Sequence, residues 1–156
     1  MKTAEKVLRE VTDLVSNKLG INISFQHGNT QTVINHITEI VNHKEAFPSI
    51  VMFTEGLTES FDGNFYEFKI PKIAICTMTV SDATEKQRLE SNFENIVYPI
   101  FKVFSDEIKK IHHGYKLIIN RTDIAYTSNS GKNEFYQLVD GCIIKDLRLK
   151  LREDEC

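Results

Sequence analysis

A long amphipathic helix is the feature that most constrains the fold of this chain of 156 residues. Apolar residues recur at helical spacing from about residue 84 to about residue 112, and Thr84 with Gln87 forms a capping box at the start. At roughly 1.5 Å per residue this helix is about 40 Å long, and its stripe is too apolar to remain exposed. We therefore expect it to lie across one face of a sheet, kinked or split at Pro99. The stripe consists of Leu89, Phe93, Ile96, Val97, Ile100, Phe101, Phe104, Ile108 and Ile111.

Two shorter helices and several strands make up the rest of the pattern. Apolar spacing predicts helices over about 3–18 and 30–44, with Gly20 as the C-terminal cap of the first. Pro71 interrupts one alternating stretch, where we expect a bulge or a break between two strands. Strands are expected over 21–25, 49–54, 65–80, 115–120 with 124–126 as a continuation, 134–139 and 142–152, and polar loops over 56–64 and 127–133.

The order of these elements predicts one α+β domain with a mixed or mainly antiparallel sheet and a long helix packed across one face. A single domain is expected over 1–152, followed by a loose tail over 153–156. The strand over 49–54 is almost entirely apolar, which predicts a central strand covered on both faces. The composition, 41% hydrophobic and 26% charged, is typical of a folded globular domain.

Charge and cysteine usage limit the classes of function. The net charge is −3, which disfavours nucleic-acid binding as the main activity but leaves room for a local basic face. Cys76, Cys142 and Cys156 match no zinc or redox spacing, and their odd number indicates a reducing compartment. No apolar run approaches the roughly 20 residues of a membrane helix, so we expect a cytoplasmic protein without a membrane partner.

The histidines offer weak metal-binding candidates. His36 and His43 lie two turns apart on one helix, and we interpret them as solvated side chains because no third ligand stands at a helpful spacing. His112 and His113 are adjacent, so their side chains diverge by about 100° along a helix. A favourable interaction with the helix C-terminus explains that pair adequately. No metal site is predicted.

Neither the paired carboxylates nor the cysteine within a strand predict catalysis. Asp106 and Glu107 are surrounded by lysines, and Glu90 and Glu94 form an i, i+4 pair, which indicates a solvated helix face. Cys76 stands in an apolar strand and is predicted to be a buried, inert thiol. The chain contains no phosphate loop, dinucleotide fingerprint or nucleophile elbow. We therefore expect a protein that is not an enzyme and has no cofactor.

The stretch from His27 to Thr30, His-Gly-Asn-Thr, is typical of a turn before a helix. Free backbone N–H groups at such a point can hold an anion. Ordinary capping of the helix is the preferred interpretation, because the stretch contains only one glycine.

The last strand carries the most informative surface feature. Arg148, Lys150 and Arg152 share one face of it, opposite an apolar face. This pattern fits an ordinary solvated strand face, and it also fits a strand that lines a subunit contact or a channel. The apolar face is formed by Leu147, Leu149 and Leu151.

A strand that ends in threonines, KIAICTMTV at 72–80, is followed by a helix, KQRLESNFENIVYPI at 86–100, and the last strand begins DGCIIKDLRL at 140–149. These segments resemble small prophage proteins of the tail-completion and tail-terminator type. The resemblance implies a non-enzymatic α+β subunit in a ring, commonly hexameric, that caps the tail tube where it meets the head. It also implies tube and neck proteins as partners, and a location in the bacterial cytoplasm and the virion tail.

Within such a ring, the basic face could point into the lumen and contact DNA without sequence preference, or contact a neighbouring subunit. Self-association is expected through the last strand and the polar loops over 56–64 and 127–133. Two other classes remain open from the residues alone. One is a small ligand-binding or enzymatic domain with a non-contiguous site, and the other is a protein-binding adaptor.

Overall fold

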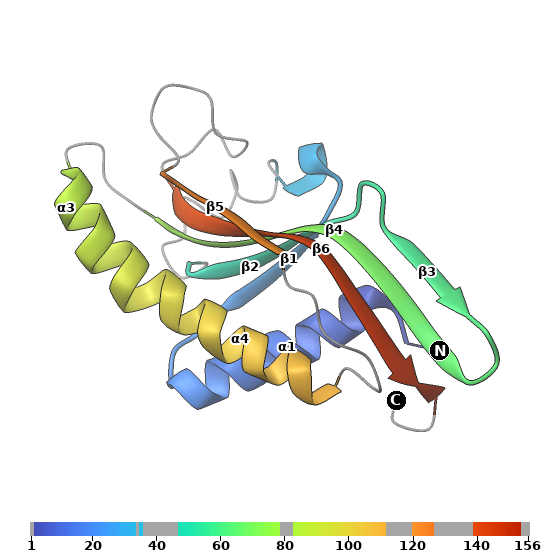
Figure 1. Cartoon of the computed structure of the whole chain (residues 1–156). Coiled ribbons are helices and arrows are strands. Elements are labelled where there is room, and N and C mark those ends of the chain that lie inside the picture. Colours follow the sequence, from blue (N-terminus) through green and yellow to red (C-terminus); the bar gives the residue numbers. More distant parts are fainter. Residues whose placement is uncertain are drawn as a thin grey trace.

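A mixed sheet of six strands forms the centre of the fold in the computed structural model (Figure 1). Five strands follow the order β1-β2-β4-β6-β5, and β3 pairs with β4 beside them. The first pair is parallel and the other pairs are antiparallel. The strands are β1 (Ser24–Gly28), β2 (Ser49–Phe53), β3 (Thr58–Phe61), β4 (Phe65–Met78), β5 (Asn120–Tyr126) and β6 (Val139–Arg152). The structure describes residues 2–33, 35, 47–78, 83–111, 120–126 and 139–153.

The helices α1 and α4 lie side by side against one face of this sheet (Figure 1). This arrangement confirms the predicted α+β class and the long helix across one face. The long helix is continuous through an α-helical, a π-helical and a second α-helical stretch. The helices are α1 (Ala4–Leu19), α3 (Glu85–Gln87), the π-helix η2 (Arg88–Val97) and α4 (Tyr98–Ile111).

The buried stripe of the long helix is narrower than its sequence predicts. Phe93, Val97, Ile100, Phe104 and Ile108 are fully buried against the sheet and α1. The side chain at 89 is 36% exposed, and those at 96, 101 and 111 are only partly buried. The fully buried part of the stripe therefore extends from Phe93 to Ile108, and Phe101 lies at its margin.

Pro99 does not split the long helix. The Tyr98 N–H donates to the Phe93 carbonyl five residues back, which is π-helical spacing, and α-helical winding begins at Tyr98. Pro99 has no N–H to donate, so it is tolerated where one hydrogen-bond pattern gives way to the other. The predicted split at Pro99 was therefore wrong, because the winding changes there along a continuous helix.

The first helix closely follows its prediction. Thr3 caps its start by accepting a hydrogen bond from the Lys6 N–H, and Gly20 ends it in the left-handed conformation at φ 65°. The prediction of a strand over 21–25 was wrong in position, because Ile21 is 40% exposed and pairing begins only at residue 24. His27 lies in β1 rather than in a turn.

The strand β2 is central and covered on both faces, as predicted. Its five residues are all buried. Ile50 and Met52 belong to the large core under the helices, whereas Val51 and Phe53 belong to a smaller apolar cluster on the opposite face. That smaller cluster also contains Val33, Ala74, Cys76 and Val139.

The two longest strands, β4 and β6, bend together. In β4 the side chains facing the large core alternate up to Ile70 and resume at Ile73, and in β6 the same jump separates Ile144 from Leu147. The pairing register is unchanged across this point, where residue 71 stands opposite Asp146 at φ 56°. The predicted bulge or break at Pro71 was wrong, since no residue is inserted and neither strand ends.

The remaining differences from prediction concern strand ends. The expected polar loop over 56–64 contains β3, and the last strand begins at Val139 rather than at residue 142. A side chain at Gly141 would place its Cβ 2.6 Å from the Ile75 carbonyl oxygen, so glycine permits the close approach of β6 to β4. Most of the expected strands over 115–120 and 134–139, the loop over 127–133 and the tail from 154 onward lie outside the described residues.

Candidate anion-binding face of the sheet

Beyond the bend, β3 and the adjoining halves of β4 and β6 extend past the helices (Figure 1). We call this region, residues 58–70 and 147–152, the arm. Its inner face continues the large core through Tyr66, Phe68 and Leu149. The backbone N–H of Ala4 donates to the Glu59 Oε1 at 2.9 Å, which ties the start of α1 to β3. The arm is therefore anchored on its inner side.

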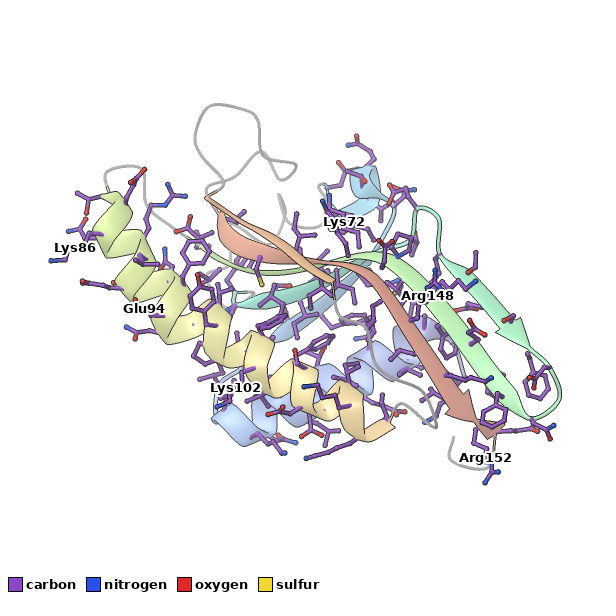
Figure 2. All side chains as sticks on the ribbon, in the orientation of Figure 1. Lys72, Lys86, Glu94, Lys102, Arg148 and Arg152 are labelled. Carbon is purple, nitrogen blue, oxygen red and sulfur yellow. The ribbon has the colours of Figure 1, made fainter. Side chains whose placement is uncertain are left out.

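The outer face of the arm gathers basic side chains. Arg148, Lys150 and Arg152 alternate with core residues along β6, so all three face away from the helices. The structure adds three cations on the same side of the sheet, and Figure 2 shows Lys72, Arg148 and Arg152 spaced along the β4–β6 ribbon. We call this set the basic face: Lys69, Lys72, Lys145, Arg148, Lys150 and Arg152.

Like charges stand directly opposite each other on both sides of the bend. Lys69 pairs with Arg148, and Lys72 pairs with Lys145. Like charges at opposed positions of an antiparallel pair destabilise the sheet, whereas opposite charges there stabilise it. The arrangement therefore concentrates positive charge along the ribbon.

Aromatic rings lie under three of these cations. The Lys72 Nζ is 4.8 Å from the centroid of the Phe53 ring. The Lys150 Nζ is 4.7 Å from the centroid of the Phe65 ring, and the Arg152 Cζ is 5.8 Å from it. Cation–π attraction holds both side chains over the ring. As a result, two of the six cations are preorganised near the end of the arm.

Carboxylates also lie near the basic face, and the charge of Glu55 interacts with that of Lys72. Glu67 stands opposite Lys150. The pKa of Asp62 lies below its ordinary value because the backbone N–H groups of Asn64 and Phe65 donate to it, with a smaller contribution from the charge of Lys150. Both hydrogen bonds fix the turn between β3 and β4. The main role of Asp62 is therefore to shape the end of the arm.

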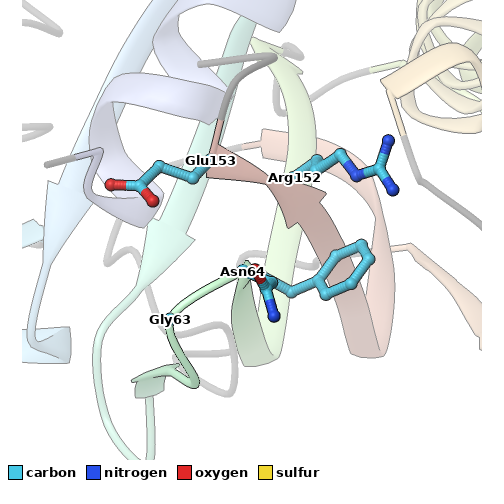
Figure 3. Close-up of a pocket in the computed structure, with 5 residues that line it drawn as sticks. Gly63, Asn64, Arg152 and Glu153 are labelled. Carbon is cyan, nitrogen blue, oxygen red and sulfur yellow. The ribbon is translucent and has the colours of Figure 1, made fainter.

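A hollow lies at this end of the arm (Figure 3). The Glu153 N–H donates to the Asn64 carbonyl at 3.0 Å, and the side chains of Arg152 and Glu153 point in opposite directions. Arg152 and Glu153 both line the hollow, so the basic face ends here beside an acidic group. The lining consists of Gly63, Asn64, Phe65, Arg152 and Glu153.

The stretch from His27 to Thr30 binds a carboxylate side chain of the same protein. The Thr30 N–H donates to the Glu55 carboxylate, and the Thr32 N–H donates to the Asn29 Oδ1 at 2.8 Å. Hydrogen bonds from Thr30, first from its side chain and then from its N–H, are the main reasons why the pKa of Glu55 lies below its ordinary value. The capping interpretation of this stretch is confirmed.

Two other predictions about titratable groups have opposite outcomes. Cys76 is buried, and this burial raises the pKa of its thiol to about 12, which confirms an inert cysteine.

Glu107 was wrongly predicted to lie on a solvated face, because its side chain is 6% exposed and contacts Lys18 of α1 and Lys110 of its own helix. Hydrogen bonds from these lysines lower the pKa of Glu107. Its neighbour Asp106 is exposed, as expected.

Sequence reasoning missed a buried polar cluster at the start of the long helix. Asp140 of β6 is fully buried and accepts hydrogen bonds from the Arg88 guanidinium and from the Asn92 Nδ2 at 2.7 Å. Both donors lie on η2, so the cluster ties the π-helix to the sheet. The spacing of Arg88 and Asn92, one helical turn, was visible in the sequence, but their partner lies 52 and 48 positions away.

The structure does not test the four histidine candidates. His36, His43, His112 and His113 lie outside the described residues. Within the described ranges, no three His, Cys, Asp or Glu side chains come together as a metal site would require. None of the helices described is both long and apolar enough to cross a membrane.

No model of a known protein family matches this chain, and none of the curated proteins matches it.

Proposed function

We propose that this protein is a non-enzymatic subunit of a phage tail, of the tail-terminator or head–tail joining type, which assembles into a ring through its arm. The observation that carries the proposal is which strands form the arm. It joins β3, from the expected contact loop over 56–64, to the last strand, so two of the three expected contact segments form one surface. The third segment lies outside the described residues.

The geometry of β3 supports a contact between neighbouring subunits. All four of its residues are exposed, and among the described strands only β4 pairs with it. The Phe61 ring is 44% exposed and stacks on Tyr66 at 4.5 Å between ring centroids. An open strand edge beside an exposed aromatic ring suits addition of a segment from another subunit. A repeated head-to-tail contact of this kind closes into a ring when its rotation permits.

Disruption of the gene in a lysogen that carries it tests the proposal. After induction we expect heads with full DNA but with tails that are absent or of irregular length in electron micrographs. Supplying the intact gene in trans should restore normal particles. Neighbouring genes for portal, capsid, tail tube and tape measure should accompany it.

A normal burst of complete particles from the disrupted lysogen would contradict the proposal. So would a neighbourhood of metabolic genes, which would favour a ligand-binding or enzymatic domain instead.

A further inference from the structure

We infer that the basic face binds the phosphate backbone of duplex DNA without sequence preference. This inference deepens the proposed function, in which DNA passes through the ring, by naming the six residues that meet it. From Lys145 to Arg152 the face extends about 23 Å at roughly 3.3 Å per residue. Over a similar length, duplex DNA carries roughly a dozen phosphates, so several can be neutralised at once.

The two like-charged pairs carry the inference. Lys69 opposite Arg148 and Lys72 opposite Lys145 repel each other in the free protein. A polyanion bound along the ribbon removes that repulsion, so binding is favoured by relief of strain as well as by direct attraction. The net charge of the whole chain is −3, so attraction of a polyanion must come from the cations gathered on this face and not from the overall charge.

The aromatic content of the face favours duplex over single-stranded nucleic acid. Proteins that bind single strands stack bases on open aromatic rings. Phe65 is the aromatic residue among the outward positions of the arm strands β4 and β6, and Lys150 and Arg152 lie over its ring. The face therefore offers cations to a backbone rather than rings to bases.

Reversal of one charge in each pair gives a discriminating test. In Lys69→Glu/Lys145→Glu, each new carboxylate faces a cation, so the thermal midpoint should rise or stay unchanged. Binding to a fluorescent 30-base-pair duplex in 50 mM salt, measured by anisotropy, should weaken by about tenfold or more. The slope of log K against log salt should become shallower by about two.

Two further variants separate charge at this face from charge in general. Lys69→Gln/Lys145→Gln removes the repulsion without adding acids, and it should lie between the wild type and the Glu variant in both measurements. Lys86→Glu/Lys102→Glu changes the net charge equally on the long helix, away from the arm (Figure 2). This control should weaken binding far less than Lys69→Glu/Lys145→Glu.

Three results would overturn the inference. One is a wild-type chain that does not bind the duplex in 50 mM salt. Another is equal weakening by the arm variant and the helix control. The third is tighter binding to polyglutamate, or to vesicles with 30% phosphatidylserine, than to the duplex, which would identify an acidic protein or a membrane as the partner. A different result would contradict the proposed function but not the inference. In that case the protein binds the duplex as expected, yet disruption of its gene leaves phage tails normal.

Discussion

Single residues in this fold are fixed by partners that lie far away in the chain. Glu107 appears in the sequence among lysines of its own helix, but its burial depends on Lys18 of α1, which packs alongside. Likewise, the need for glycine at 141 comes from the Ile75 carbonyl of a neighbouring strand. Local sequence could not reveal either constraint, because both arise only when separate elements meet.

The ion pairs of Glu107 predict a pH-dependent contribution to stability. The unfolded carboxyl titrates near 4.5, and the hydrogen bonds from Lys18 and Lys110 lower its pKa in the folded state. Their stabilisation is therefore complete above about pH 4.5 and is lost as the pH falls through the folded-state pKa. In urea unfolding, Glu107→Gln should be less stable than the wild type at pH 7, and this difference should shrink at pH 3.

Asp106→Asn is the matched control for that measurement, because Asp106 is exposed on the same helix. It should change the urea midpoint little at either pH. A Glu107→Gln defect of equal size at both pH values would show that packing, rather than the carboxylate charge, is responsible.

At the scale of elements, helices and strands with a regular apolar period were predicted from the sequence, whereas elements without one were missed. The capped helix from residue 84 and the apolar strand β2 follow their patterns closely, because burial of one face imposes the period directly. The strand β3 was missed because its sequence, Thr-Glu-Ser-Phe, is exposed throughout and has no buried face to signal it. Arg148, Lys150 and Arg152 were found by alternation, but Lys69 and Lys72 lie on either side of Pro71, where the alternation changes phase.

The shared bend of β4 and β6 depends on the backbone of Asp146. Its φ of 56° lies in the left-handed region, which costs an ordinary residue roughly 1–2 kcal/mol and which Asp tolerates better than most. Asp146→Val should therefore lower the free energy of unfolding by about 1–2 kcal/mol in urea titrations. Asp146→Gly removes the same carboxylate but suits this φ, and it should be far less damaging.

Equal losses in the two Asp146 variants would show that the carboxylate, not the backbone, matters at this position.

At the scale of the whole molecule, the proposed assembly predicts self-association that depends on concentration. In sedimentation velocity, the wild type should shift from monomer to larger species as its concentration rises. Phe61→Glu should raise the concentration needed by tenfold or more, since burial of a large apolar side chain is worth about 1.5–3 kcal/mol. Leu14→Glu alters a similarly exposed apolar residue on α1 and should leave the shift in place.

A wild type that stays monomeric across its soluble range would argue against contacts made by the arm, and so would a Leu14→Glu defect as large as that of Phe61→Glu.

The matched bend also restricts how the lengths of these two strands can vary. In both strands the alternation of core residues changes phase at the same rung. An insertion or deletion of one residue in β4 alone would therefore turn the inward residues on one side of it outward. A compensating change opposite, in β6, would restore the match. Length variants that keep the fold should therefore gain or lose residues on both strands together, or only in the turns that join them.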